Sequence, residues 1–105
     1  MKTILRALLM FLALALVFSS YSFADGAADF KAKCVACHGA TGAGDTTMGK
    51  NLKLKDLGSA EVQKQTDDEL TTTISKGKAK MPAYDGKLSK EQIADVVKFI
   101  RSLKK

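Results

Sequence analysis

Apolar residues spaced three and four positions apart predict a helix near the end of the chain. The stripe consists of Ile93, Val96, Val97, Ile100 and Leu103, which share one helical face. The tetrapeptide Ser-Lys-Glu-Gln at 89–92 has the pattern of a capping box, in which the first and fourth side chains accept from each other's backbone N–H groups. We therefore expect a helix from about residue 90 whose apolar stripe lies in the core.

A second capping box, from Thr66 to Glu69, predicts another helix that ends near Gly77. Leu70 and Ile74 lie four residues apart and form its apolar face. An alanine-rich first helix is expected over residues 26–34.

Weaker signals complete the order of elements. A short helix is expected at 59–64. Four of the eleven residues from 39 to 49 are glycine, which predicts a loop, and a second loop is expected at 78–87 around the only proline, Pro82. No stretch alternates polar and apolar residues as a strand does, so the fold class is expected to be all-α.

The chain opens with the charge order of a secretory signal peptide. Lys2 and Arg6 precede an apolar run at 7–18, and small residues follow as far as Ala24. We expect cleavage after Ala24, export to the periplasm, and a single domain at 25–105. The alternative is an uncleaved membrane anchor, but a run of this length is short of the roughly 20 residues that span a bilayer.

The net charge narrows the classes of partner. The formal charge of the whole chain is +6, and removal of Lys2 and Arg6 with residues 1–24 lowers it to +4. The basic residues are spread out and include no arginine-rich block, which argues against nucleic-acid binding. An acidic protein partner or a membrane surface is favoured, and the alternative is a lysine surface that serves only solubility.

A domain of this size often needs a disulfide, metal or cofactor to complete its core. The two cysteines, Cys34 and Cys37, could form at most one disulfide, whose loop is too short to stabilise the fold much. Another group is therefore expected to complete the core.

The sequence Cys34-Val-Ala-Cys37-His38 has the pattern of c-type haem attachment. The two thiols can form thioethers with the vinyl groups of one haem, and the next residue can place its imidazole on the iron. A thioredoxin-type dithiol usually lies near a βαβ pattern, which is absent. Structural zinc usually takes four Cys or His ligands, and residues 25–105 offer three.

The sixth iron position could be taken by a methionine, a lysine or no side chain. Of the four methionines, only Met48 and Met81 lie beyond the predicted signal peptide, residues 1–24. Met48 is interpreted as a flexible apolar filler. Met81 is the predicted ligand, because Pro82 stiffens the chain beside it and a His/Met pair is a recurring haem ligation.

These residues resemble those of the class I c-type cytochromes, the small kind with one haem. The resemblance covers essentially all of 25–105 and rests on Gly26 and Phe30, the haem motif, the glycine loop, Met81-Pro82 with Tyr84, and Phe99. It implies three to five helices around one covalent haem c, with the first and last helices crossing where Gly26 and Phe30 meet the face of Val96, Phe99 and Ile100. It also implies His38 as proximal and Met81 as distal iron ligand.

The chain departs from this family in two places. Many members have Gly-Pro after the glycine loop, where a backbone carbonyl accepts from the proximal histidine, whereas this chain has Gly-Lys-Asn-Leu at 49–52. Such an acceptor is expected, since it fixes the ring orientation, but the sequence does not identify it. There is also no tryptophan to contact a haem propionate, and Asn51, a lysine or a backbone amide could replace it.

The function expected is that of a soluble periplasmic one-electron carrier, a monomer and not an enzyme. The alternatives are a haem subunit of a larger dehydrogenase or oxidase complex and a haem-based gas sensor or peroxidase. Eight lysines near the haem-bearing segments are expected to include some that steer an acidic partner: Lys31, Lys33, Lys50, Lys53, Lys55, Lys76, Lys78 and Lys80.

Overall fold

Six helices follow one another in the computed structural model, which describes residues 21–105. They are α2 (Tyr21–Lys33), α3 (Val35–His38), α4 (Thr47–Asn51), α5 (Ala60–Gln63), α6 (Asp67–Lys76) and α7 (Lys90–Ser102). The predicted leader, residues 1–24, lies outside the described residues except for its last four, whose backbone forms the first turn of α2. Within 21–105 there is no strand, only isolated bridges between Lys78 and Met81 and between Asp85 and Leu88. The all-α expectation is confirmed.

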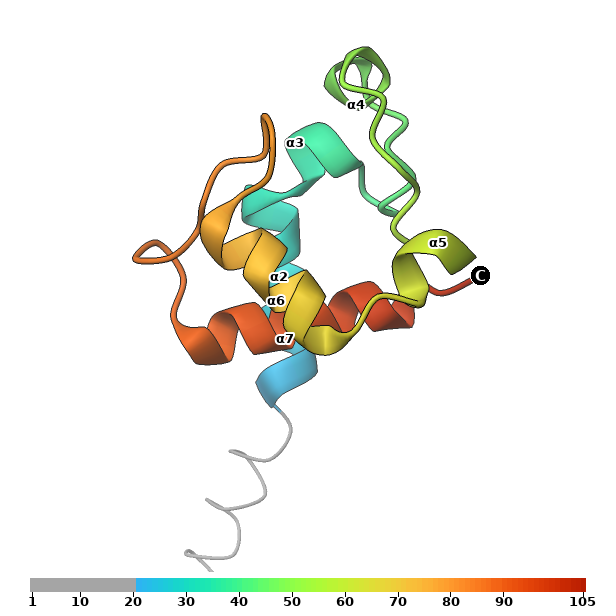
Figure 1. Ribbon diagram of the computed structural model, residues 1–105. Helices are drawn as coiled ribbons and strands as arrows, with labels where there is room; N and C mark the ends of the chain where they lie inside the picture. Colours follow the sequence, from blue (N-terminus) through green and yellow to red (C-terminus); the bar gives the residue numbers. More distant parts are fainter. Residues whose placement is uncertain (1–20) are drawn as a thin grey trace, which may run out of the picture.

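The two terminal helices, α2 and α7, cross and form the centre of the fold (Figure 1). A Cβ atom on Gly26 would collide with the backbone carbonyl of Asp95, so only glycine allows this approach. The rings of Phe30 and Phe99 pack with their centroids 4.8 Å apart and tilted by 46°. This is the crossing that the resemblance implied.

Two helices begin where the capping boxes predicted. Thr66 precedes α6 and accepts from the backbone N–H of Glu69 at 3.1 Å, and the Glu69 carboxylate accepts from the Thr66 backbone N–H at 3.4 Å. Ser89 and Gln92 make the corresponding pair before α7, at 3.1 and 2.8 Å. The short helix predicted at 59–64 is α5.

Nine buried apolar side chains make up the core of the described residues: Phe30, Val62, Leu70, Ile74, Leu88, Ile93, Val96, Val97 and Ile100. They come mainly from α2, α6 and α7, so the apolar faces predicted from spacing are the faces that pack. Leu103 follows the end of α7 and is half-buried against this core.

The prediction that 39–49 is entirely loop is wrong, because α4 begins at Thr47. The Thr46 hydroxyl accepts from the backbone N–H of Gly49 at 2.9 Å and donates to the carbonyl of Cys37 at 2.7 Å. One side chain therefore both begins the helix and attaches it to the haem motif. The segment 42–57, called the arm below, carries α4 at its tip (Figure 1).

The first helix also differs from its expected bounds. It was expected from about residue 26 and is described from Tyr21. Residues 21–25 contain no glycine or proline that would interrupt a helix, so α2 runs through the expected cleavage position after Ala24. No helix in the described part of the chain is long and apolar enough to cross a membrane.

Candidate haem site

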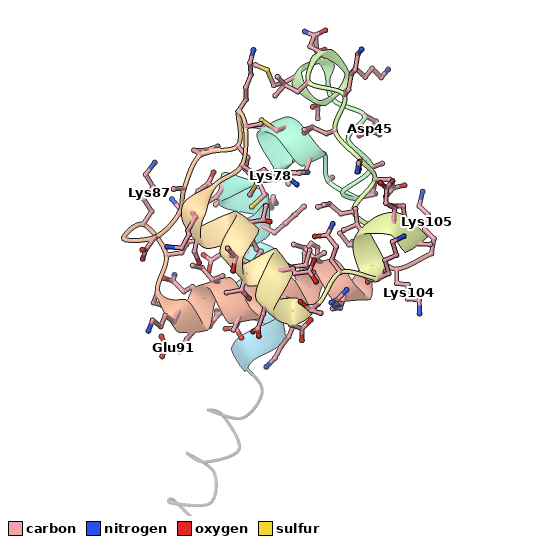
Figure 2. The ribbon with its side chains drawn as sticks, in the orientation of Figure 1. Asp45, Lys78, Lys87, Glu91, Lys104 and Lys105 are labelled. Carbon is pink, nitrogen blue, oxygen red and sulfur yellow. The ribbon has the colours of Figure 1, made fainter. Side chains whose placement is uncertain are left out.

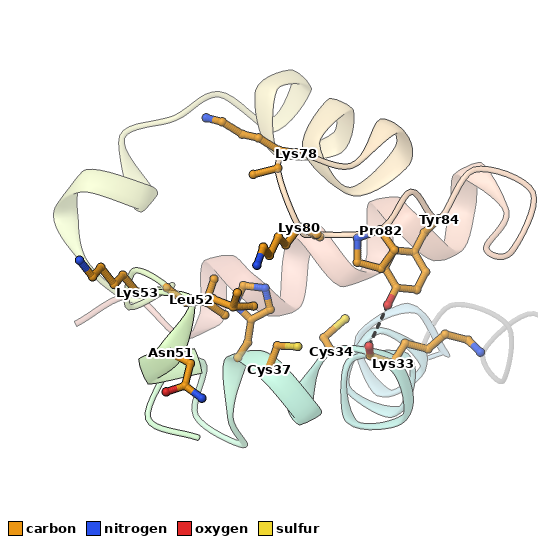
Figure 3. A pocket seen from close by; sticks show the side chains of 14 residues that line it. Lys33, Cys34, Cys37, Asn51, Leu52, Lys53, Lys78, Lys80, Pro82 and Tyr84 are labelled. Carbon is orange, nitrogen blue, oxygen red and sulfur yellow. Dashed lines mark hydrogen bonds between the residues drawn. The ribbon is translucent and has the colours of Figure 1, made fainter. Parts of the chain in front are cut away.

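A cavity of about 380 Å³ lies between the α2–α3 junction, the arm and the segment after α6 (Figure 3). Four lining residues are those predicted from sequence, namely Cys34, Cys37, His38 and Met81. A smaller hollow of about 200 Å³ shares three of them and extends to the core beside Phe30. The predicted site residues, 47 positions apart at their extremes, thus meet at one place that reaches from the surface to the core.

The two thiols are positioned by a single helical turn. Cys34 is the N-cap of α3 and Cys37 lies three residues later, so both side chains project from one side of the turn. The backbone N–H of Cys34 donates to Phe30 at 2.8 Å, and that of His38 donates to Cys34 at 2.9 Å, which joins the motif to α2. Both thiols are free and half-buried. Burial, followed by the charges of Asp29 and Cys37, raises the pKa of Cys34 to about 11.

The imidazole of His38 is held in the form that binds a metal. Burial lowers its pKa, which favours the neutral ring with a free nitrogen lone pair. Its Nδ1 is buried without a hydrogen-bond partner among the described residues. The acceptor that was expected for the ring, but not identified, is thus not found among the described residues. In the stretch that replaces Gly-Pro, the Lys50 carbonyl accepts from the backbone N–H of Lys53 at 3.2 Å.

Met81 lies on the opposite side of the cavity in a tight turn. The backbone groups of Lys78 and Met81 bond each other at 3.2 and 3.0 Å. Gly77 has a φ of +75°, and a Cβ there would lie 2.5 Å from the Met81 carbonyl oxygen. The distal segment is thus folded closely against the end of α6.

Tyr84 joins the two sides of the cavity, which the sequence did not predict. Its hydroxyl donates to the backbone carbonyl of Lys33 at 3.0 Å, as the dashed line in Figure 3 shows. Tyr84 lines the cavity with Cys34 and Met81, and burial raises the pKa of its hydroxyl. In the sequence, Tyr84 stands out only through the resemblance, as the aromatic residue three positions after Met81.

The interpretation of Met48 as an apolar filler is wrong. Its side chain is 51% exposed and lines neither cavity. The buried side of α4 is occupied by Gly49, where a Cβ would lie 2.5 Å from the carbonyl oxygens of both Cys37 and Gly44. That close packing leaves Met48 on the outer side.

The charged side chains that line the cavity are all basic. Among its lining residues are Lys33, Lys53, Lys78 and Lys80, and none of the described residues that line it is acidic. These side chains come from α2, the arm and the segment after α6, and Figure 3 shows Lys80 pointing into the cavity. All eight lysines singled out in the sequence are exposed, and Figure 2 labels Lys78 among them.

The residues present fit a covalently bound haem. The cavity has the size of a cofactor site and offers two thiols on one turn, a neutral imidazole and a thioether across from it. His38 Nδ1 is buried without a hydrogen-bond partner among the described residues, so the imidazole is not engaged through this nitrogen by another described side chain or carbonyl.

Comparisons with known proteins agree with this chemistry. A family model described as cytochrome c oxidase, cbb3-type, subunit III matches residues 22–100. The cytochrome c6 of Microcystis aeruginosa is 36% identical over 76 residues, which is 72% of this chain and 90% of that protein. The cytochrome c6 of Thermostichus vulcanus is 32% identical over 94 residues, 90% of this chain and 81% of that protein. The solved structure of the KustC0563 c-type cytochrome matches with a TM-score of 0.71 and 29% identity, covering 76% of this chain and 98% of that one.

The family model spans most of the described residues, and the relatives and the solved structure share both the fold and the kind of protein. The cofactor is therefore a covalently bound haem c, and the protein transfers electrons rather than acting as an enzyme. The chain belongs to the class I c-type cytochromes.

Proposed function

We propose that the protein is an exported one-electron carrier in which Cys34 and Cys37 hold the haem by thioethers and His38 and Met81 take the axial positions. The observation that supports this is the convergence of all four side chains on one cavity, with the first three from the turn after α2 and Met81 from the segment after α6.

The four residues have distinct tasks in this proposal. When bound, the haem supplies an iron that gains or loses one electron. Cys34 and Cys37 fix the haem covalently, and neutral His38 donates a nitrogen lone pair. The soft thioether of Met81 favours the ferrous state and raises the reduction potential. A buried site disfavours the extra charge of the oxidised state and acts in the same direction.

Replacement of Met81 tests the axial assignment. Met81→Ala should leave the haem attached but open the iron, so that carbon monoxide and imidazole bind and the absorption band of the sulfur–iron bond disappears. Met48→Ala is the matched control, because Met48 lines neither cavity, and its spectrum should equal that of the wild type. Identical spectra for all three proteins would contradict the assignment. Carbon monoxide binding by the wild type would instead favour a gas sensor.

Export and cleavage are tested by the intact mass of the protein recovered from the periplasm. The proposal expects a monomer that begins at Asp25 and carries the mass of one haem, with no membrane insertion after removal of 1–24. A mass that includes residues 1–24 would favour the anchored form.

The partner we propose is a redox protein with an acidic docking surface rather than nucleic acid. The cavity that would hold the haem is lined by four basic side chains and no acidic one among the described residues, namely Lys33, Lys53, Lys78 and Lys80. Complementary charge increases association rates and orients the encounter.

A second candidate is a haem subunit of a larger complex, which the description of the matching family model favours. Purification under mild conditions distinguishes the two. A free carrier should elute as a single small protein at physiological salt, whereas a subunit should elute with a second polypeptide.

A further inference from the structure

The hydrogen bond from Tyr84 to Lys33 connects segments 51 positions apart. Lys33 is the last residue of α2 and directly precedes Cys34, whereas Tyr84 lies three residues after Met81. The last carbonyl groups of a helix have no partner within that helix. The Tyr84 hydroxyl supplies a donor to one of them, and in doing so spans the cavity from its distal to its proximal side.

The proximal end of this connection is rigid. Cys34 donates to the Phe30 carbonyl at 2.8 Å and accepts from the backbone N–H of His38 at 2.9 Å, so the carbonyl of Lys33 belongs to a continuous bonded path from α2 into the haem motif. The Tyr84 hydroxyl, which is bonded to the Lys33 carbonyl, is therefore held at a fixed position relative to Cys34 and Cys37.

The distal end is bonded mainly to itself and to α6. The backbone N–H of Tyr84 donates to the Ile74 carbonyl on α6 at 3.0 Å. Between Met81 and Tyr84 stands Pro82, which has no N–H to donate. The Tyr84 backbone thus fixes the segment to α6, and its hydroxyl fixes the same segment to α2. The paired backbone bonds of Lys78 and Met81 hold Met81 within its own turn, whereas the Tyr84 hydroxyl bond joins this segment directly to the end of α2.

We propose that Tyr84 is a positioning residue for Met81, whose hydroxyl bond to Lys33 keeps the Met81 thioether over the iron on the face opposite His38. This inference rests on the proposed His/Met ligation. Tyr84 does not touch the iron, and its aromatic ring also packs against the core and lies 5.7 Å from the Lys87 ammonium. The positioning role belongs to the hydroxyl.

Tyr84→Phe in the haem-loaded protein isolates the hydroxyl, because the ring and its packing remain. Imidazole competes with Met81 for the iron, so its apparent affinity for the ferric protein measures how firmly the thioether is held. We expect that affinity to increase by about two- to tenfold, the range that corresponds to the net contribution of one hydrogen bond. The sulfur–iron band should weaken and the reduction potential should decrease.

Two further variants separate the possible outcomes. Ser89→Ala removes the N-cap bond before α7, outside both cavities, and should lower thermal stability without changing the imidazole affinity. Met81→Ala serves as the reference, because it shows the imidazole affinity of the ferric protein when no thioether competes for the iron. If Tyr84→Phe matches the wild type, or changes no more than Ser89→Ala, while Met81→Ala binds imidazole more tightly, then the positioning role is wrong and the ligation stands. If Met81→Ala also matches the wild type, the ligation itself is wrong.

Discussion

Two residues other than glycine at the cavity have left-handed backbone. Lys53 has a φ of 56° and Ala79 a φ of 54°, and both line the cavity. A Cβ atom in this region crowds the next carbonyl at a cost of about 1–2 kcal/mol. Such strain persists only where the surroundings impose it, and at Ala79 the paired backbone bonds of Lys78 and Met81 do so.

Ala79→Gly should raise the free energy of unfolding by about 0.5–1 kcal/mol, because the relief of Cβ crowding exceeds the added entropy of an unfolded glycine. Chemical denaturation of the haem-loaded protein measures the change. Ala83→Gly is the control in the same segment, since Ala83 has no positive φ, and there the substitution should be destabilising. A loss of stability in both variants would show that the Ala79 backbone is not strained.

At the level of elements, the loop before α5 is joined to the segment after α7 by an ion pair and a backbone hydrogen bond. The Asp56 carboxylate lies 2.6 Å from the Lys105 ammonium and accepts from the backbone N–H of Gly58 at 2.8 Å. The Gly58 carbonyl in turn accepts from the backbone N–H of Lys105 at 3.1 Å. The bonds to Lys105 and Gly58 lower the pKa of Asp56 from its ordinary value of 3.8.

This shift predicts a pH-dependent stability. The folded protein binds the Asp56 proton more weakly than the unfolded chain, so the stabilisation is present above about pH 4 and is lost as the pH falls through the lowered pKa. Asp56→Asn should therefore have a lower Tm than the wild type at pH 7, and the difference should shrink as the pH falls below about 4. Asp85→Asn, at an exposed carboxylate, is the comparison. A constant Tm difference across this range would refute the linkage.

How far the sequence predicts an element depends on whether its signal is local. Both capping boxes and the apolar face of α7 were predicted because each pattern lies within a few adjacent residues. The haem motif is equally local, and so the proximal site residues could be named. The helix α4 was missed although its cap, from Thr46 to Gly49, is local, because the position of the capping-box Glu or Gln is occupied by glycine and the segment is glycine-rich. The bond from Tyr84 to Lys33 was missed because it joins residues 51 positions apart, and no local pattern predicts it.

On the scale of the whole molecule, charge is unevenly placed. Four lysines line the cavity without an acidic neighbour in the described lining, whereas Asp67, Asp68 and Glu69 lie together in the first turn of α6. A charge distribution of this kind attracts an anionic reactant toward the cavity and orients it there.

Charge reversal tests this orientation with small redox complexes of opposite sign. Lys53→Glu and Lys78→Glu should each slow oxidation by ferricyanide by about two- to tenfold at low ionic strength and accelerate the reaction with a cationic cobalt complex. Added salt should reduce both differences. Lys98→Glu on α7, which does not line the cavity, should have a smaller effect. Equal changes in rate for all three variants would show that the rates depend on the net charge of the protein and not on where the lysines lie.

The arm has a mechanical consequence for the whole molecule. It is closed at its base by the bond from Leu57 to the Gly42 carbonyl at 2.8 Å, and at its tip α4 packs chiefly against α3 and is bonded to it through Thr46 and the Cys37 carbonyl, so this wall of the cavity is attached on the side of the haem motif. A flat, rigid haem bound between the arm and the Met81 segment would restrict the movement of both. The group that stores the electron would then also supply the stiffness that so short a polypeptide lacks.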